Sequence, residues 1–588
     1  MKLSPIPDWG SPRRVALGAF ALWVLSLAAA LPALPRLARS LGDTDDAMRL
    51  TMVRELASGR GWFDQKLERL QPPQGVYMHW SRLVDGAEAG LLQLFGAVLA
   101  PDRAEIAMRL AWPLLWALPV SVAVLLLARR LGGGRAVFLG MVSAAISFHA
   151  SGEFAAGRVD HHAVQIACCL AAVAAGVARR PAWRAAAVCG LATALGLAVG
   201  LEALPFLALV GAGWGLSWAF GRTEGRIVAA YGAALAAGAL GLHAVQTPPD
   251  RWLTPACDAL AINLAAGLAA AGAGLCLAAV LGARAGRAAR LALLALAVAA
   301  AGAAYLAIAP LCLHGPMAAI DPTLRVLWLD RIREMAPWLT LLGQDPGQAL
   351  SLAAPALAGL AGWAWLARRR ELRANPAWRL LGALLIVSIP FSLEASRYGQ
   401  YALWFAAPLT AAAAVDLAEV AVRGLMIPAV LGLVALTTLP GEAAGRLAAG
   451  QGVPASLSAA GPDSACSDNR AFQRLAGLPP GLVLSEIDAG PYVLAETPDA
   501  VVQAPYHRMG WGIAAARAAL GAPPAEAEAQ VRALGVRYIA NCPAHAGQSD
   551  RESLAAESLQ RTLDAGRAPP WLEPLSPPGE PVQVYRLR

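Results

Sequence analysis

The sequence predicts a polytopic α-helical membrane protein with about thirteen transmembrane helices, followed by a soluble α/β domain. Hydrophobic residues make up 57% of the chain and charged residues only 15%, with a mean hydropathy of +0.50. A soluble protein of 588 residues would carry far more charge. From about Pro440 the composition changes, and no later run is both long and apolar enough to cross a bilayer.

Apolar runs of bilayer length recur along the first three quarters of the chain. The first, at 15–34, follows Arg13 and Arg14; Pro32 and the lack of a clean cleavage site indicate an uncleaved span rather than a signal peptide. The remaining spans are expected at 105–128, 136–152, 163–178, 184–200, 203–220, 226–245, 259–281, 288–312, 347–367, 378–393, 401–420 and 424–441.

Arginine-rich loops predict the orientation of these spans. Under strict alternation, every loop on one side is basic, and the positive-inside rule places that side in the cytoplasm. The N-terminus is then cytoplasmic, and the odd number of spans puts the C-terminus in the periplasm of a bacterial inner membrane. The net charge of +8 comes largely from these loop arginines, so it does not call for a nucleic-acid partner.

We therefore expect a transmembrane domain at 1–441, with periplasmic loops at 37–88, 151–162 and 313–346, and a periplasmic domain at 442–588. Short apolar runs around 481–484, 536–540 and 582–585, with a helix-like segment at 525–534, indicate an α/β fold for the tail. The tail contains no P-loop or dinucleotide fingerprint.

The cysteines follow the same division. Cys312 and the other cysteines in apolar spans are expected to pack as small hydrophobic residues. Cys466 and Cys542 belong to the tail, where a disulfide forms only if the tail faces an oxidising compartment.

The first expected periplasmic loop opens with three carboxylates in four residues, Asp43, Asp45 and Asp46. Acidic side chains at a membrane surface are costly unless they hold a cation or take part in chemistry. The alternative is a solvated loop that merely ends a transmembrane helix.

The second loop contains Arg158, Asp160, His161 and His162. Asp-His-His is a set of zinc ligands, but adjacent histidine side chains are expected to diverge, so we favour a carboxylate that meets another acid across a cleft. The alternative is a polar cap on the loop.

Two later segments add charged groups. Residues 328–338 mix acids, arginines and tryptophans, which fits either a loop that contacts an anionic ligand or an ordinary interfacial helix. Arg397 stands at the periplasmic end of a late span, where it could clamp a phosphate or anchor a lipid headgroup.

These segments together resemble the catalytic subunits of oligosaccharyltransferases, polyprenyl-dependent membrane glycosyltransferases of the GT-C type with thirteen spans and a C-terminal domain outside the cytoplasm. Asp45 followed by Arg54-Glu55-Leu56 is similar to the first motif of that family, and Gly157-Arg158-Val159-Asp160 to the second. Arg331-Ile332-Arg333-Glu334, followed by Pro337, is similar to the motif in the long fifth loop. The resemblance covers most of the membrane part.

The resemblance implies that Asp45, Asp160 and Glu334 are catalytic, with Asp45 and Asp160 binding a divalent cation, Mg²⁺ or Mn²⁺, at the lipid pyrophosphate. It also implies a set of residues that bind substrate: Asp43, Arg158, His162, Arg331, Arg397 and Tyr401. Tyr401 occupies the best register for the phosphate-binding arginine of the family, about a turn from Arg397, and the position of His162 is often acidic in the family.

The tail departs from the family because the Trp-Trp-Asp motif for acceptor recognition is absent. Residues 485–492 and 504–508 stand there instead. Asparagine glycosylation of a sequon is therefore not favoured over transfer to another periplasmic acceptor, which would be a glycan, a lipid-linked saccharide or a different protein side chain.

The predicted function is transfer of a sugar or oligosaccharide from a polyprenyl-(pyro)phosphate donor in the membrane lipid to that acceptor. The cation would stabilise the leaving phosphate, and Glu334 or Asp43 would accept the proton of the acceptor. With a monophosphate donor, Asp45 becomes the expected base.

Two other classes of function compete with this one. A transporter or flippase for a lipid-linked glycan would place ionisable groups at the bilayer midplane and contain repeated halves. Here the acids cluster in loops, and no repeat is evident. A membrane anchor that presents the tail as a binding module would need far fewer spans.

Overall fold

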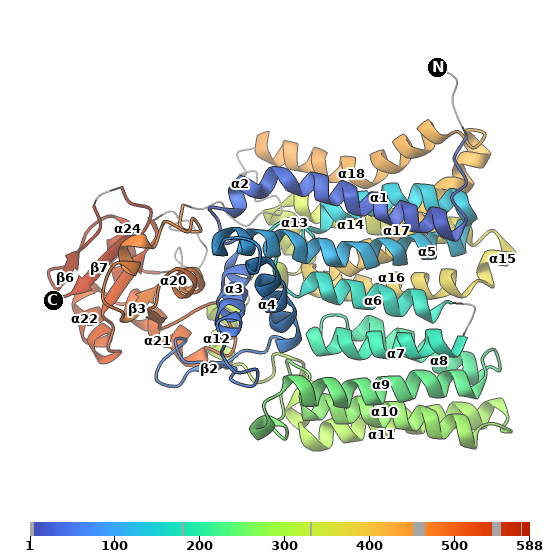
Figure 1. Cartoon of the computed structure of the whole chain (residues 1–588), viewed down its shortest axis with the longest axis horizontal. Helices are drawn as coiled ribbons and strands as arrows, with labels where there is room; N and C mark the ends of the chain where they lie inside the picture. The colour runs from blue at the N-terminus through green and yellow to red at the C-terminus, as the bar shows by residue number, and fades with distance from the viewer. Residues whose placement is uncertain (1–4, 179–181, 330–331, 451–464, 544–553, 578) are drawn as a thin grey trace.

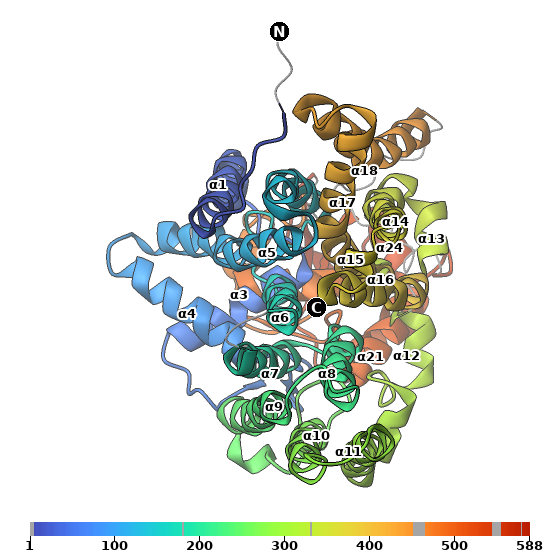
Figure 2. The ribbon, with the colours of Figure 1, turned by 90° about the vertical axis from the view of Figure 1, so that its right-hand side faces the viewer.

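The structure is a computed structural model that describes residues 5–178, 182–329, 332–450, 465–543, 554–577 and 579–588. Long helices lie side by side in a bundle, and the C-terminal residues form a lobe of strands and short helices at one end of it (Figure 1). Seen along the bundle, α1 and α18 lie at one edge, and α9, α10 and α11 lie at the opposite edge (Figure 2). The bundle consists of α1 (Pro12–Ala30), α5 (Pro101–Ser151), α6 (His162–Gly176), α7 (Ala182–Val199), α8 (Leu204–Ala219), α9 (Gly225–Gln246), α10 (Ile262–Leu281), α11 (Arg287–Ile308), α14 (Pro346–Leu366), α16 (Pro376–Glu394), α17 (Gly399–Ala421) and α18 (Met426–Gly450).

Among the described residues, nine helices are long and apolar enough to cross a membrane, and three shorter apolar helices lie beside them. The chain is therefore a membrane protein. Side chains on α11 such as Leu296 and Val298 are largely exposed, as expected for a helix whose outer face contacts lipid. By contrast, α17 is buried along 401–413, because it packs between α5, α14 and α16.

The two spans expected at 105–128 and 136–152 are the two helical segments of α5. This element breaks at Gly132 and Gly133, whose backbone angles are not helical, with φ of +67° at Gly133. A residue with a side chain rarely adopts such an angle, so the glycine allows the chain to turn between two helical segments. Because Pro101 occupies the first turn, its missing N–H leaves no helical hydrogen bond unmade.

The first loop forms two helices and a small hairpin between α1 and α5. Helix α3 (Thr44–Ala57) carries the acidic stretch, and α4 (Arg82–Gly96) packs against it. Strands β1 (Lys66–Leu67) and β2 (Val76–Tyr77) pair antiparallel between the two helices. Other short helices are α2 (Leu34–Leu37) before α3, α12 (Pro322–Leu327) and α13 (Trp338–Gln344) in the long fifth loop, and α15 (Arg370–Arg373) between α14 and α16.

The C-terminal lobe contains a five-stranded mixed sheet in the order β4-β3-β5-β7-β6. Strand β3 runs parallel to β4 and β5, whereas β7 runs antiparallel to β5 and β6. The strands are β3 (Leu482–Ser485), β4 (Ala500–Val501), β5 (Tyr538–Asn541), β6 (Leu572–Pro574) and β7 (Gln583–Leu587), and the helices are α19 (Gln473–Ala476), α20 (Gly490–Glu496), α21 (Gly510–Gly521), α22 (Pro524–Ala533) and α24 (Leu559–Asp564).

Two disulfides join segments outside the bundle core. Cys466 pairs with Cys542 within the C-terminal lobe. Cys257, which precedes α10, pairs with Cys312 after α11. The expectation that Cys312 packs as a free hydrophobic residue is therefore wrong: α11 ends at Ile308, which leaves Cys312 in the following loop, within reach of Cys257.

The C-terminal lobe docks directly on the first loop. Arg69 donates hydrogen bonds to the carbonyl oxygens of Leu494, Thr497 and Asp499. In return, the amide of Val501 donates to the Arg69 carbonyl over 2.8 Å. The lobe therefore sits against the loop that carries the acidic stretch.

Candidate functional site

The start of α3 assigns a different role to each acid of the first loop. Asp43 is the N-cap, and its Oδ1 accepts hydrogen bonds from the amides of Asp45 and Asp46 at 3.1 and 2.9 Å. Asp46 completes the capping box and also accepts the Val159 amide at 2.9 Å. Two of the three carboxylates are thus committed to backbone groups.

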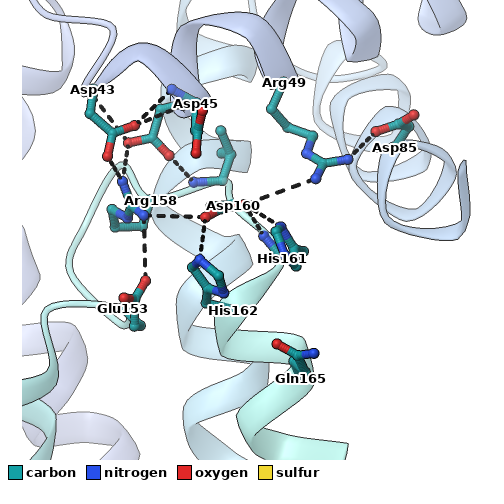
Figure 3. Close-up of polar contacts among 12 residues, drawn as sticks. Asp43, Asp45, Arg49, Asp85, Glu153, Arg158, Asp160, His161, His162 and Gln165 are labelled. Carbon is teal, nitrogen blue, oxygen red and sulfur yellow. Dashed lines mark hydrogen bonds and ion pairs between the residues drawn. The ribbon is translucent and has the colours of Figure 1, made fainter. Parts of the chain in front are cut away.

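The carboxylate of Asp45, unlike those of Asp43 and Asp46, does not cap the helix. Among the described residues, none donates a hydrogen bond to its side chain. Burial, followed by the charges of Asp160, Asp43 and Glu334, raises its pKa well above the usual value. The three acids predicted to be catalytic therefore share one electrostatic environment, and Asp45 and Asp160 lie in the same view in Figure 3.

Asp160 is held by the two histidines that follow it. The Nδ1 atom of His161 lies 2.5 Å from Oδ1, and the Nε2 atom of His162 lies 3.3 Å from Oδ2. The ring centroids of the histidines are 4.3 Å apart. The expectation that adjacent histidines diverge is wrong here, because each ring reaches a different oxygen of the same carboxylate (Figure 3).

The contact between Asp160 and His161 shifts the pKa values of the two side chains in opposite directions. Burial alone would raise the pKa of Asp160, but His161, His162 and Arg158 hold it well below the usual range. Burial would lower the pKa of His161, yet Asp160 and Glu202 raise it to about 10. His161 is therefore a cation at neutral pH that fixes the orientation of Asp160.

Arg158 lies at the centre of the acids and joins the two loops. Its guanidinium pairs with Asp43, lies 3.2 Å from Asp46, and lies 3.4 Å from both Glu153 and Asp160. These carboxylates raise its pKa against the effect of burial. Because its donors already face four carboxylates, Arg158 positions the acidic loops and is poorly placed to clamp a further anion.

Arg397 connects the other predicted residues. Its Nη2 atom lies 3.2 Å from both His162 Nε2 and Glu202 Oε1, and 3.5 Å from Glu334 Oε1. The side chain of Glu334 is 47% exposed, so it is open to an incoming molecule. Arg331 lies outside the described residues.

Tyr401 is buried and, within the described part of the chain, does not contact the acids directly. Its hydroxyl donates to Gln165 at 2.7 Å, and Gln165 donates to Glu202 at 2.8 Å. Tyr401 thus reaches the site through two other side chains. Glu202 was not predicted as a site residue, although it lies in a loop of the expected sidedness, which is the signal that could have found it.

A second buried cluster behind Asp160 was also missed. Arg49 pairs with Asp85 at 2.5 Å, lies over the ring of Trp80 at 4.4 Å, and places Nη2 3.9 Å from Asp160. Glu88 is buried beside it, and burial raises its pKa well above the usual value. Arg49 lies one helical turn after Asp45, so both point toward Asp160 from the same helix.

These residues fit a divalent cation. Asp160, His161 and His162 each place one ligand atom within 4.8 Å of the other two. The Nε2 atom of His162 faces both Arg397 and an oxygen of Asp160. The carboxylate of Asp45 acts on Asp160 through its charge, and among the described residues nothing donates a hydrogen bond to it. A cation would bind to these ligand atoms and relieve the repulsion between the two carboxylates.

Comparisons with known proteins bear on the fold. No protein-family model matches the sequence, and no curated protein matches it. The apo crystal structure of the Archaeoglobus fulgidus oligosaccharyltransferase aligns with a TM-score of 0.64 at 14% identity, covering 90% of this chain and 70% of that chain.

Two further structures of the enzyme from that organism agree. The archaeal oligosaccharyltransferase AglB in complex with an inhibitory peptide and a dolichol-phosphate aligns with a TM-score of 0.63 at 13% identity, covering 97% of this chain and 74% of that chain. The complex with Zn and sulfate gives 0.60 at 13%, covering 96% and 73%. The chain therefore resembles oligosaccharyltransferases in fold, as its motifs predict.

Proposed function

We propose that this chain, which has the fold of an oligosaccharyltransferase, is a membrane glycosyltransferase. It transfers a sugar or oligosaccharide from a polyprenyl-(pyro)phosphate donor to an acceptor at the outer face of a bacterial inner membrane. The observation that carries the proposal is the acidic centre, in which Asp45, Asp160 and Glu334 act on one another although they come from three separate loops. The likeness to AglB supports it through the fold alone.

Asp45, Asp160 and His162 would hold a divalent cation. Such an ion supplies Lewis-acid stabilisation of the negative charge that develops on the leaving phosphate. Carboxylates suit both Mg²⁺ and Mn²⁺, but an imidazole in the same set favours Mn²⁺. His161 and Arg158 then serve as the groups that hold Asp160 in place.

Arg397 is the side chain that we assign to the donor phosphate. Its guanidinium faces two carboxylates, those of Glu202 and Glu334, and its buried Nε has no hydrogen-bond partner among the described residues. Arg158, by contrast, faces four carboxylates. A phosphate that enters beside Glu334 would meet the Arg397 donors directly.

The transfer step breaks the bond between the anomeric carbon and the phosphate oxygen, and the phosphate leaves with the electron pair. The nucleophile of the acceptor forms the new bond at the same carbon and loses its proton. Glu334 is the exposed carboxylate at the centre, so we assign it as the group that accepts this proton.

The acceptor would approach from the C-terminal lobe. The Tyr492 hydroxyl donates to the Gly42 carbonyl at 2.9 Å, and the Tyr506 hydroxyl donates to the Thr44 carbonyl at 3.1 Å. Both tyrosines come from the segments that stand where the family has its acceptor motif. We propose a periplasmic acceptor that is a glycan, a lipid-linked saccharide or a protein.

The proposed topology has thirteen crossings, because α5 contributes two segments on either side of Gly133. The N-terminus is then cytoplasmic, and the domain at 442–588 is periplasmic. Two disulfides, Cys257–Cys312 and Cys466–Cys542, support this orientation, because such bonds form in oxidising compartments and both pairs lie on the proposed outer side.

The test uses the purified full chain in detergent, without a sealed compartment. We expect label from a polyprenyl-linked sugar to appear in an added acceptor mixture, and we expect the D45A and D160A variants to lose this transfer. A transporter would bind the labelled lipid under these conditions but leave the label on it. Binding without transfer across a panel of donors and acceptors would therefore contradict the proposal.

A further inference from the structure

A second group of potential metal ligands lies outside the acidic centre, where three distant segments meet. His79 follows β2 in the first loop, Asp258 precedes α10, and His507 precedes α21 in the C-terminal lobe. One ligand atom from each residue lies within 4.8 Å of the other two. The His507 Nε2 atom is 2.6 Å from Asp258 Oδ2, and the two imidazole centroids are 4.4 Å apart.

One of these ligand-bearing side chains has an unsatisfied atom. The Nδ1 atom of His79 is buried and has no hydrogen-bond partner among the described residues. A buried polar nitrogen without a partner costs free energy, and this one belongs to a ring packed against a second imidazole. A bound cation would provide the missing partner.

The carboxylate of Asp258 is held in place by Arg508. Arg508 donates to Asp258 through Nε at 2.8 Å and through Nη2 at 2.6 Å, and its Nη1 donates to the Tyr77 carbonyl at 2.8 Å. The neighbouring Cys257 is tied to Cys312 by a disulfide. Metal-ligating carboxylates are commonly hydrogen-bonded in this way by a second layer of residues, which fixes their orientation.

We propose that His79, Asp258 and His507 form a zinc site that fastens the C-terminal lobe to two loops of the membrane domain. Two imidazoles and one carboxylate, with water as the fourth ligand, are a ligand set that tetrahedral Zn²⁺ accepts. With the neighbouring Cys257 and Cys312 paired, the ligands here are nitrogen and oxygen rather than thiolate.

The site would act on the acidic centre through packing. Trp80 follows His79 and packs edge-on against Tyr506, which precedes His507, with centroids 5.3 Å apart. Trp80 also lies under Arg49, and Tyr506 donates to the carbonyl at the start of α3. Zinc binding therefore restrains the residues that position the acidic helix.

The experiment measures zinc bound to the purified full chain after chelator treatment and reloading with Zn²⁺ alone, by mass spectrometry of the metal. The acidic centre is removed as a second source of zinc by working in a D45A/D160A background. We expect one zinc per chain in that background, and its loss when H79A or H507A is added. The matched control is H149Q, because His149 is an exposed histidine at the end of α5, and this variant should retain the zinc.

A second measurement needs no variant of the ligands. Zinc should protect His79 and His507, but not His149, from acylation by diethyl pyrocarbonate in the otherwise unaltered chain. Equal zinc content with and without H79A, or equal acylation with and without zinc, would overturn the site and leave a plain ion-pair contact. Neither readout depends on sugar transfer, so failure here is distinct from failure of the proposed function.

Discussion

The Nε2 atom of His162 lies 3.3 Å from the Oδ2 atom of Asp160, and the same nitrogen faces Arg397 at 3.2 Å. His162 therefore stands between the carboxylate of Asp160 and Arg397, which lies just before α17. Through Arg397 the contact continues to Glu334 in the long fifth loop. This chain of contacts explains how loops separated by more than 200 residues build one centre.

Removing a carboxylate from this centre should abolish transfer. We expect D45A or D160A to lower the rate by at least about 100-fold, because each loses a ligand for the cation that stabilises the leaving phosphate. The measurement is the rate of label transfer by purified protein. D64A is the matched control, since Asp64 is an exposed acid of the same loop that pairs with Arg60; an equal loss in D64A would contradict the assignment.

Removing the metal should have the same effect and be reversible. Transfer should stop after treatment with a chelator and return on addition of Mn²⁺, with weaker recovery in Mg²⁺ because an imidazole is part of the proposed ligand set. In the H162N variant, the transfer rates recovered with Mn²⁺ and with Mg²⁺ should be closer to each other. Full activity after exhaustive chelation, with no residual metal by mass spectrometry, would argue against a metal-dependent reaction.

Replacing Arg397 should weaken binding of the donor. A charge-assisted hydrogen bond to phosphate contributes about 1.5–3 kcal/mol, so we expect R397A to reduce kcat/KM for the lipid donor by about 10- to 100-fold. R368A is the control, because Arg368 pairs with Asp416 at the other end of α17. The assignment fails if R397A retains its affinity for the phosphate of the donor.

The hydroxyl of Tyr506 should matter for the position of Asp45 as well as for thermal stability. Y506F removes the hydrogen bond to the Thr44 carbonyl, which we expect to cost about 1 kcal/mol and to slow transfer by about 5-fold through misplacement of Asp45. Y538F removes a comparable bond to the Pro479 carbonyl within the lobe. It should lower thermal stability to a similar degree and leave the transfer rate unchanged; equal rate losses would point to a general effect of the lobe.

The disulfide of the C-terminal lobe should contribute to its persistence. In C466S/C542S we expect the free energy of unfolding of the lobe to fall by about 2–4 kcal/mol. This loss should appear as a shorter half-life of transfer activity on heating. C276S alters a free cysteine in α10 and should leave the half-life unchanged. Peptide mapping without reductant checks the pairing directly, and free thiols at both positions in protein purified from cells would contradict it.

The helical part of the fold could be predicted from the sequence because each membrane span is a long run of apolar residues. The expected spans near α9 to α11 and α14 to α17 differ from the helices by a few residues at their ends. The break in α5 was also placed correctly, since a run of glycines separates two apolar stretches. Cys312 was misjudged because its role depends on Cys257, more than fifty residues away.

The candidate site was only partly predictable. Asp45, Asp160 and Glu334 were predicted because they are acids in loops of one sidedness and match motifs of the oligosaccharyltransferase catalytic subunits. The structure brings their charges together, and their catalytic roles stay a prediction. Glu202 and Arg49 were not found, since neither belongs to a motif and their importance lies in what they contact. The contact of both histidines with Asp160 likewise depends on how the loop turns into α6.

The sequence by itself determined that the chain spans a membrane, and it indicated which loops carry the acids, because hydrophobicity and charge are properties of short segments. The tertiary structure decided which of the three carboxylates accepts no hydrogen bond from the part of the chain that the structure describes. Asp43 and Asp46 cap α3, and Arg158 joins them to the second loop, so Asp45 remains to face Asp160. The capping is a local pattern, but the contacts of Asp43 and Asp46 with Arg158 and Val159 join residues more than a hundred positions apart, which no local pattern of residues encodes.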